Sequence, residues 1–166
     1  MDYKQLKNKY NTPLYVYDVD LIKEIINKYQ QNFHSPKFQT EILYASKAFC
    51  VKEMLRLIKQ QDLSLDVVSI GELYTAIAVD FDLSKVYFHG NNKSYDDLLF
   101  AINKGVKTIV VDNLMELETL EKLLTTINKQ VDILIRLNVG VEAHTHKFIV
   151  TAHVDSKFGV LYKSED

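Results

Sequence analysis

Short apolar segments recur along this chain at regular intervals. Each is rich in valine, isoleucine, leucine or aromatic residues, and each is followed by a stretch whose apolar positions repeat with the period of an α-helix. The segments are centred near Leu43, Leu65, Phe88, Val110 and Leu134. Strands that alternate with helices in this way are typical of βαβ units, which build a parallel sheet.

Polar residues mark where the predicted helices begin and end. Ser69 and Glu72 have the spacing of a capping box, in which the serine oxygen accepts a backbone N–H and the glutamate reaches back to the cap. Ser94 supplies a second cap, and the two aspartates that follow it favour the positive end of a helix dipole. Gly105 is suited to end that helix before the next apolar segment. These signals predict a helix between each pair of strands.

A further helix is predicted over residues 114–128. Its glutamates come early and its lysines late, as the helix dipole favours. The spacing of its leucines predicts a single buried face. That face comprises Leu117, Leu120, Leu124 and Ile127.

The N-terminal part of the chain predicts one strand and one helix. Residues 1–11 are polar and lysine-rich, which indicates a short leader or a frayed helix. Residues 12–18 are mostly β-branched or aromatic, with a proline near the start, and predict a strand. Residues 19–33 carry apolar positions at helical spacing and predict a helix that Asp18 or Asp20 caps.

Two α/β architectures fit this order of elements. A flavodoxin-like doubly wound sheet has five strands and matches the length, whereas a (β/α)8 barrel has eight strands and usually ~250 residues. Counting alone therefore favours the open sheet. Two details oppose it, because no glycine-rich phosphate turn follows the first strand and no helix is predicted to cover the last one.

Composition excludes several classes of protein. The chain has 166 residues, which suffices for one domain with a sizeable core, and 47% of them are hydrophobic and 25% charged. The net charge is −2 and the lysines are dispersed, which argues against a nucleic-acid surface. No apolar run approaches the ~20 residues of a membrane span, and residues 1–7 lack an apolar signal core. With Cys50 as the only cysteine, these features favour the cytoplasm.

Polar or charged side chains follow every one of the five predicted strands. They are Lys47, Asp66, His89 with Asn91 and Asn92, Asp112 with Asn113, and Arg136 with Asn138. The carboxyl ends of parallel strands lie at one edge of a sheet, where α/β proteins build ligand sites. Together these residues suggest an anionic, multiply hydrogen-bonded ligand. Helix capping is the competing interpretation, above all for Asp112 and Asn113 ahead of Leu114.

Lys47 admits three interpretations. It could extend into solvent from a strand end, bind phosphate as a point charge, or act as a Schiff-base lysine. The last role requires a carbonyl partner, which is either a keto substrate or pyridoxal phosphate. His144, His146, His153 and Asp155 also admit interpretation as a metal cluster. The first two are spaced to share one side of a strand, but no third ligand has a diagnostic spacing, which favours a polar loop.

Several segments, in order along nearly the whole chain, resemble those of the alanine-racemase-like (fold type III) pyridoxal-phosphate decarboxylases. The lysine motif is Tyr44 to Ala48, and the second-strand segment is Asp66 to Leu73. Other segments are similar to those typical of the diaminopimelate decarboxylases. These are Tyr10 to Asp18, His89 to Ser94, Arg136 to Val141, Ala143 to His146, and Asp155 to Gly159. Val139, where the family often has proline, and residues 151–152, where it often has Thr-Gly, depart from the pattern.

The resemblance implies a specific chemistry. Lys47 would hold pyridoxal phosphate, and Asp66, His89 and Arg136 would line the cofactor end, with His144 and His146 as weaker candidates nearby. The activity would be decarboxylation of meso-2,6-diaminopimelate to L-lysine and CO2, by a homodimer when full length. Another fold type III decarboxylase or racemase acting on a basic amino acid, and a non-catalytic flavodoxin-like binding module, are the alternatives.

The resemblance also implies an incomplete enzyme. Residues 36–166 would form about five βα units of a pyridoxal-phosphate-binding (β/α)8 barrel. Residues 1–35 would supply a strand, joined to a β-domain that this chain lacks, and a helix. The family's stacking histidine, glycine-rich phosphate loop and acidic partner of the pyridine nitrogen have no counterpart in this sequence. We therefore expect residues 1–166 alone to be inactive and either poorly soluble or associated.

Overall fold

The computed structural model describes residues 2–139 and 158–162, which fall into two compact units. The first ends at Thr40 and the second begins at Glu41. The first holds two helices, α1 (Tyr3–Tyr10) and α2 (Val19–Asn32). The carboxylate of Asp18 caps α2 by accepting the backbone N–H groups of residues 20 and 21, which confirms the predicted helix and one of its two predicted caps.

The strand predicted over residues 12–18 is wrong. Residues 14–18 are extended in part but belong to no strand. A strand exists only where its backbone groups pair with a neighbouring chain segment, and the described residues of this unit contain no second strand. The β-branched and aromatic residues therefore indicate a local preference for extended backbone, but no second described segment of this unit pairs with them as a strand.

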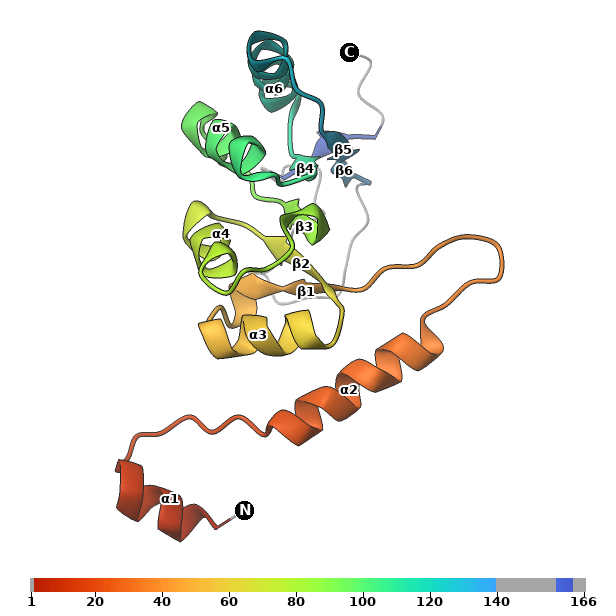
Figure 1. Ribbon diagram of the computed structural model, residues 1–166. Coiled ribbons are helices and arrows are strands. Elements are labelled where there is room, and N and C mark those ends of the chain that lie inside the picture. Colours follow the sequence, from red (N-terminus) through yellow and green to blue (C-terminus); the bar gives the residue numbers. More distant parts are fainter. Residues whose placement is uncertain (1, 140–157, 163–166) are drawn as a thin grey trace. The chain divides into compact units, whose positions relative to one another are not determined.

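The second unit contains a five-stranded parallel sheet in which the strands follow one another in chain order (Figure 1). Each strand corresponds to one predicted apolar segment. The strands are β1 (Leu43–Ala45), β2 (Ser64–Val67), β3 (Val86–Phe88), β4 (Thr108–Val111) and β5 (Asp132–Ile135). The helices are α3 (Lys52–Gln60), α4 (Ile70–Ile77), α5 (Tyr95–Lys104) and α6 (Leu114–Ile127), with 3-10 turns at Ser46–Ala48 and Leu83–Lys85. A separate parallel pair joins β6 (Leu137–Asn138) to β7 (Val160–Leu161).

The strand order decides between the two architectures. Each crossover advances by one strand in the same direction, and because such crossovers are right-handed, all the helices fall on one face of the sheet. Figure 1 shows α4, α5 and α6 on the same side of the strands. A flavodoxin-like sheet reverses direction and carries helices on both faces. The doubly wound alternative is therefore wrong, and the sheet is an arc of a (β/α) barrel with five of its strands.

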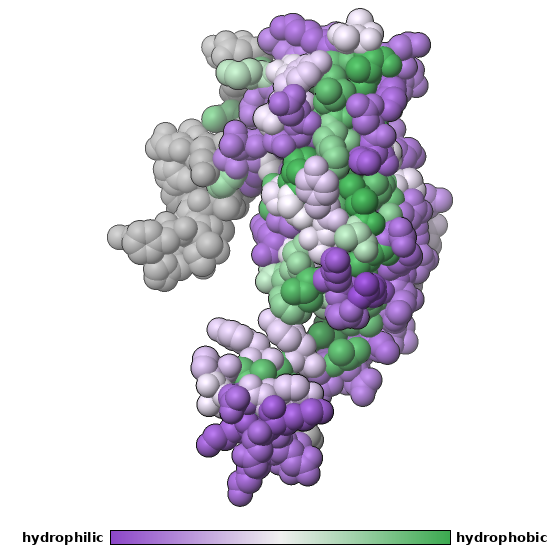
Figure 2. All heavy atoms as spheres, turned by 60° about the vertical axis from the view of Figure 1, so that its left-hand side comes forward, coloured by the Kyte–Doolittle hydropathy of each residue, from purple (hydrophilic) through white to green (hydrophobic). Residues whose placement is uncertain are grey.

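The core lies between the sheet and these helices. Alternate residues of β2, β3 and β4 point toward the helices and are almost fully buried, as period-two alternation requires. The fully buried side chains include Leu65, Val67, Val86, Phe88 and Ile109 from the sheet, and Leu55, Ile58, Leu73, Leu98, Leu120 and Leu123 from the helices. On the side that carries the helices, hydrophobic residues form a band at the surface that hydrophilic residues flank (Figure 2). No described helix is both long and apolar enough to cross a membrane.

The last strand, β5, is exposed on both faces. Ile133, Leu134 and Ile135 expose 41%, 51% and 48% of their surface. Ile133 also lines a groove of about 660 Å3, together with half-buried leucines of α6. The face of α6 therefore differs from the prediction: its buried positions are Glu116, Leu120 and Leu123, whereas Leu117, Leu124 and Ile127 are half-buried.

Candidate active site at the strand ends

Lys47 lies in the 3-10 turn that follows β1 directly. Its side chain is exposed, and it forms no hydrogen bond or ion pair with any residue that the structure describes. The neighbouring Ser46 is fully buried, and its hydroxyl oxygen lies 2.8 Å from Asp66 O and 2.6 Å from Glu72 Oε2, either of which can accept its one proton. The turn is thus fixed to the adjacent strand through Ser46, while the amine of Lys47 stays available for a ligand.

Asp66 and His89 come together from neighbouring strands. His89 Nδ1 lies 3.5 Å from Asp66 Oδ1, and the His89 backbone N–H donates to Val67 O at 2.8 Å. The other ring nitrogen of His89, Nε2, is buried and has no hydrogen-bond partner among the described residues. A hydrogen bond from Nδ1–H to the carboxylate would leave Nε2 as the atom that meets a ligand.

Asp112 and Arg136 form the second pair, one strand further along the sheet. Arg136 Nη1 lies 2.9 Å from Asp112 Oδ1, and the Arg136 guanidinium stacks over the ring of Phe158 with 4.5 Å between Cζ and the ring centroid. Asp112 is 1% exposed, and its second oxygen, Oδ2, has no hydrogen-bond partner in the described part of the chain. Asn113, not Asp112, caps α6, because its side-chain oxygen accepts the Glu116 N–H at 2.9 Å.

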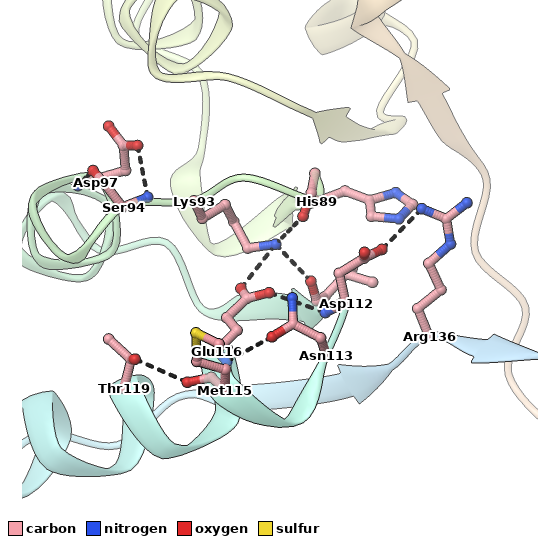
Figure 3. A network of polar contacts seen from close by, with 12 residues as sticks. His89, Lys93, Ser94, Asp97, Asp112, Asn113, Met115, Glu116, Thr119 and Arg136 are labelled. Atoms are coloured by element: carbon pink, nitrogen blue, oxygen red, sulfur yellow. Dashed lines mark hydrogen bonds and ion pairs between the residues drawn. The ribbon is translucent and has the colours of Figure 1, made fainter. Parts of the chain in front are cut away.

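The sequence did not predict a buried ion pair that joins the loop after β3 to the first turn of α6 (Figure 3). Lys93 Nζ lies 2.8 Å from Glu116 Oε1, and their side chains are only 1% and 6% exposed. This contact has ion-pair distance but not hydrogen-bond alignment, since Oε1 has no hydrogen-bond partner. Lys93 also donates to Gly90 O and, at 2.9 Å, to Val110 O. Its flanks, two asparagines and a serine, indicate a loop, so nothing in the local pattern suggested burial.

The predicted capping box at α4 is only half correct. Ser69 Oγ accepts the Glu72 N–H at 3.3 Å as predicted, but Glu72 Oε2 accepts the N–H of Val68 and not that of Ser69. The same arrangement recurs at α6, where Glu116 Oε2 accepts the Asp112 N–H at 3.0 Å. In both helices the third residue after the cap therefore binds the end of the preceding strand.

Gly90 brings the loop after β3 against the end of β2. Its φ of +116° lies in a region that side chains other than glycine rarely adopt, and a Cβ there would lie 2.9 Å from Val68 O. The position of His89 therefore depends on a glycine next to it. Asn91 and Asn92, in the same loop, are exposed.

Some predicted candidates lie beyond the described residues. His144, His146, His153 and Asp155 all fall within residues 140–157, which are not described. Among residues 2–139 and 158–162, no three histidine, cysteine or acidic side chains gather in a way that could hold a metal ion.

The fold and the strand ends together define part of a (β/α) barrel domain that gathers polar and charged side chains at the carboxyl edge of its sheet. The chain belongs to the pyridoxal-dependent decarboxylases, whose pyridoxal binding domain matches residues 19–166. The donor set fits that cofactor, since it offers an exposed amine on Lys47 together with two buried polar atoms, His89 Nε2 and Asp112 Oδ2, that lack partners among the described residues.

Several relatives of this chain are named diaminopimelate decarboxylase. The chain is 48% identical over 159 residues to diaminopimelate decarboxylase of Bacillus subtilis, and 41% identical over 157 residues to that of Staphylococcus aureus. Diaminopimelate decarboxylase of Helicobacter pylori complexed with L-lysine superposes with a TM-score of 0.88 at 30% identity. These alignments cover 95% or 96% of this chain but only 36%, 37% and 40% of the respective relatives. The chain thus spans little more than a third of their length.

Proposed function

We propose that this chain contributes the pyridoxal-phosphate-binding part of an enzyme that decarboxylates meso-2,6-diaminopimelate to L-lysine and CO2, and that residues 1–166 alone are inactive. The observation that carries the proposal is Lys47, an exposed lysine free of described partners that directly follows a strand of a pyridoxal binding domain. The 48% identity to the Bacillus subtilis enzyme supports the substrate. A cytoplasmic location and a homodimeric full-length enzyme are parts of the same proposal.

Each strand-end residue has a role that its contacts support. Lys47 would hold the cofactor through its amine, and Asp66 would orient the His89 ring so that Nε2 meets the cofactor. Arg136, held by Asp112 and Phe158, would present a fixed positive charge to an anionic group. When bound, the cofactor supplies an electron sink for the charge left after loss of CO2.

Reduction with borohydride tests the lysine assignment. The enzyme for this test is a chimera in which residues 1–166 replace the matching segment of the Bacillus subtilis enzyme, because the relatives are longer than this chain. After incubation with pyridoxal phosphate and reduction, peptide mass analysis should find the label on Lys47. The Lys47→Arg variant is the control and should remain unlabelled at that peptide. A label elsewhere, or none in the unaltered chimera, would contradict the assignment.

A substrate assay tests the reaction itself. The chimera should release L-lysine from meso-diaminopimelate and should not act on arginine or on carboxylated polyamines. Turnover of one of those compounds in preference to diaminopimelate would assign the chain to another decarboxylase of the family. Interconversion of amino-acid enantiomers without CO2 release would indicate a racemase.

A further inference from the structure

The buried pair of Lys93 and Glu116 joins two segments that carry strand-end residues. On one side, the Lys93 ammonium binds the carbonyl of Gly90, the residue next to His89. On the other side, the Glu116 carboxylate accepts the N–H of Asp112 at 3.0 Å. Between them, Lys93 Nζ and Glu116 Oε1 are 2.8 Å apart (Figure 3). A continuous series of polar contacts therefore runs from the loop after β3 to the end of β4.

Each end of this series lies next to a residue with a buried polar side-chain atom that could contact a ligand. His89 Nε2 and Asp112 Oδ2 lack hydrogen bonds among the described residues. The pair itself cannot reach a ligand, since the Lys93 side chain is 1% exposed and its ammonium is already occupied by three oxygens. Lys93 and Glu116 are therefore suited to act on the site only through the residues they hold.

We propose that Lys93 and Glu116 are positioning residues that set the placement of His89 and Asp112 relative to each other at the cofactor end of the site. The proposal rests on the proposed function, because it assumes that His89 and Asp112 face the cofactor. Two apolar side chains of similar volume would satisfy packing here at least as well as a buried ion pair. Such apolar side chains would not supply the hydrogen bonds to two backbone carbonyls and one backbone N–H that hold both segments in place.

The test removes the pair without leaving a lone buried charge. In the chimera, Lys93→Met combined with Glu116→Gln eliminates both charges, while the glutamine can still accept the Asp112 N–H. Loss of a supporting contact around a site typically lowers affinity or activity by about 10- to 100-fold. We expect the dissociation constant of pyridoxal phosphate to rise and kcat to fall by about 10-fold each, with KM changed by less than about 3-fold.

Two further variants keep the result interpretable. Lys59→Met is the matched control, because Lys59 also donates to two backbone carbonyls, those of Val79 and Asp80, but at the ends of α3 and α4 away from the strand ends. It should leave cofactor affinity within about 2-fold of the unaltered chimera. If the double variant fails to fold, Lys93→Gln combined with Glu116→Gln also removes both charges but keeps polar groups at the two positions, and it should weaken cofactor binding in the same direction.

Coupling to His89 separates positioning from general destabilisation. In a His89→Ala background, removal of the pair should weaken cofactor binding by much less than it does when His89 is present. Fully additive effects, or a folded double variant with unchanged cofactor affinity and kcat, would overturn the proposal. An unaltered chimera that binds no cofactor would instead refute the proposed function.

Discussion

The guanidinium of Arg136 lies 2.9 Å from the carboxylate of Asp112, which joins the end of β4 to the residue that follows β5. Asp112 is 1% exposed, whereas the Arg136 side chain keeps 26% of its surface in solvent. Removing one partner of a buried pair leaves the other charge uncompensated, which is the main cost of such a change. The pair therefore makes Asp112 a sensitive position for both folding and the site.

Asp112→Ala should lower the free energy of unfolding by about 2–3 kcal/mol, less than for a fully buried pair because Arg136 can turn toward water. Asp132→Ala is the matched control: its pair with Lys107 spans 3.1 Å, but both side chains are 63% exposed. Its effect should stay below about 1 kcal/mol. Urea unfolding of the chimera, followed by circular dichroism, measures both. Equal losses in the two variants would contradict the burial argument.

Gly90→Ala should be more damaging than Gly105→Ala. Both glycines have positive φ, +116° and +98°, but only at Gly90 would the new methyl group meet the backbone, 2.9 Å from Val68 O. We expect a loss of about 2–3 kcal/mol at Gly90 and about 1 kcal/mol at Gly105, where nothing lies within 4 Å. The same urea experiment compares them. A Gly90→Ala variant as stable as Gly105→Ala would mean that the loop after β3 can move away from β2.

The sequence allowed the five strands to be predicted because each needs a continuous apolar segment on its buried face. Length and strand count did not predict the strand order, since they favoured a sheet that reverses direction. The resemblance to the fold type III family implied five units of a (β/α) barrel instead, and the strand order confirms that prediction. The strand over residues 12–18 failed for a related reason: local preference cannot supply the second strand with which a first must pair. The amphipathic period of α6 was recognised, but its buried face was displaced, because Glu116 turns inward to meet Lys93.

The strand-end residues were predictable from parallel topology alone, which brings successive strand ends to one edge. Their pairing was not. His89 could have met any of several carboxylates, and the geometry selects Asp66 at 3.5 Å. Lys93 and Glu116 were missed because charged residues in a loop and in a first helical turn are usually solvated. The one available signal was the spacing of Asn113 and Glu116, which matches a cap followed by an acidic side chain.

The stability of the chain should depend on pH through Tyr87. Its hydroxyl donates to the carboxylate of Glu41, and this hydrogen bond, together with burial and the charge of Glu41, raises the pKa of Tyr87 from 10.0 to about 12. A raised folded-state pKa gives stabilisation that is complete below pH 10 and is lost as the pH rises from 10 toward 12. The stability difference between the unaltered chain and Tyr87→Phe should therefore be constant from pH 7 to 9 and shrink above pH 10.

Glu41→Gln tests the cause of that shift. Without the carboxylate, the ionised tyrosine would no longer face a like charge, so the folded-state pKa of Tyr87 should fall. The alkaline loss attributed to Tyr87 should then still begin near pH 10, but it should be smaller and end at lower pH. Urea unfolding at a series of pH values gives both comparisons. An unchanged alkaline profile in Glu41→Gln would assign the effect to burial instead of to the hydrogen bond. Ser64 also donates to Glu41, so its serine–glutamine contact should be retained and limit any general destabilisation.

The exposed surface around β5 should make residues 1–166 associate when they are produced alone. Ile133 and Ile135 each expose more than two fifths of their surface, and the adjoining groove beside α6 is lined by Leu117 and Leu124. An unpaired strand edge next to an open apolar groove favours pairing with another chain. We therefore expect oligomers or aggregates by size-exclusion chromatography with light scattering, and no decarboxylase activity. Replacing Ile133 and Ile135 by lysine should shift the chain toward monomer. Met115→Lys, at a 78% exposed apolar position on α6 outside the groove, should not. A monodisperse, active monomer of the unaltered chain would contradict this expectation.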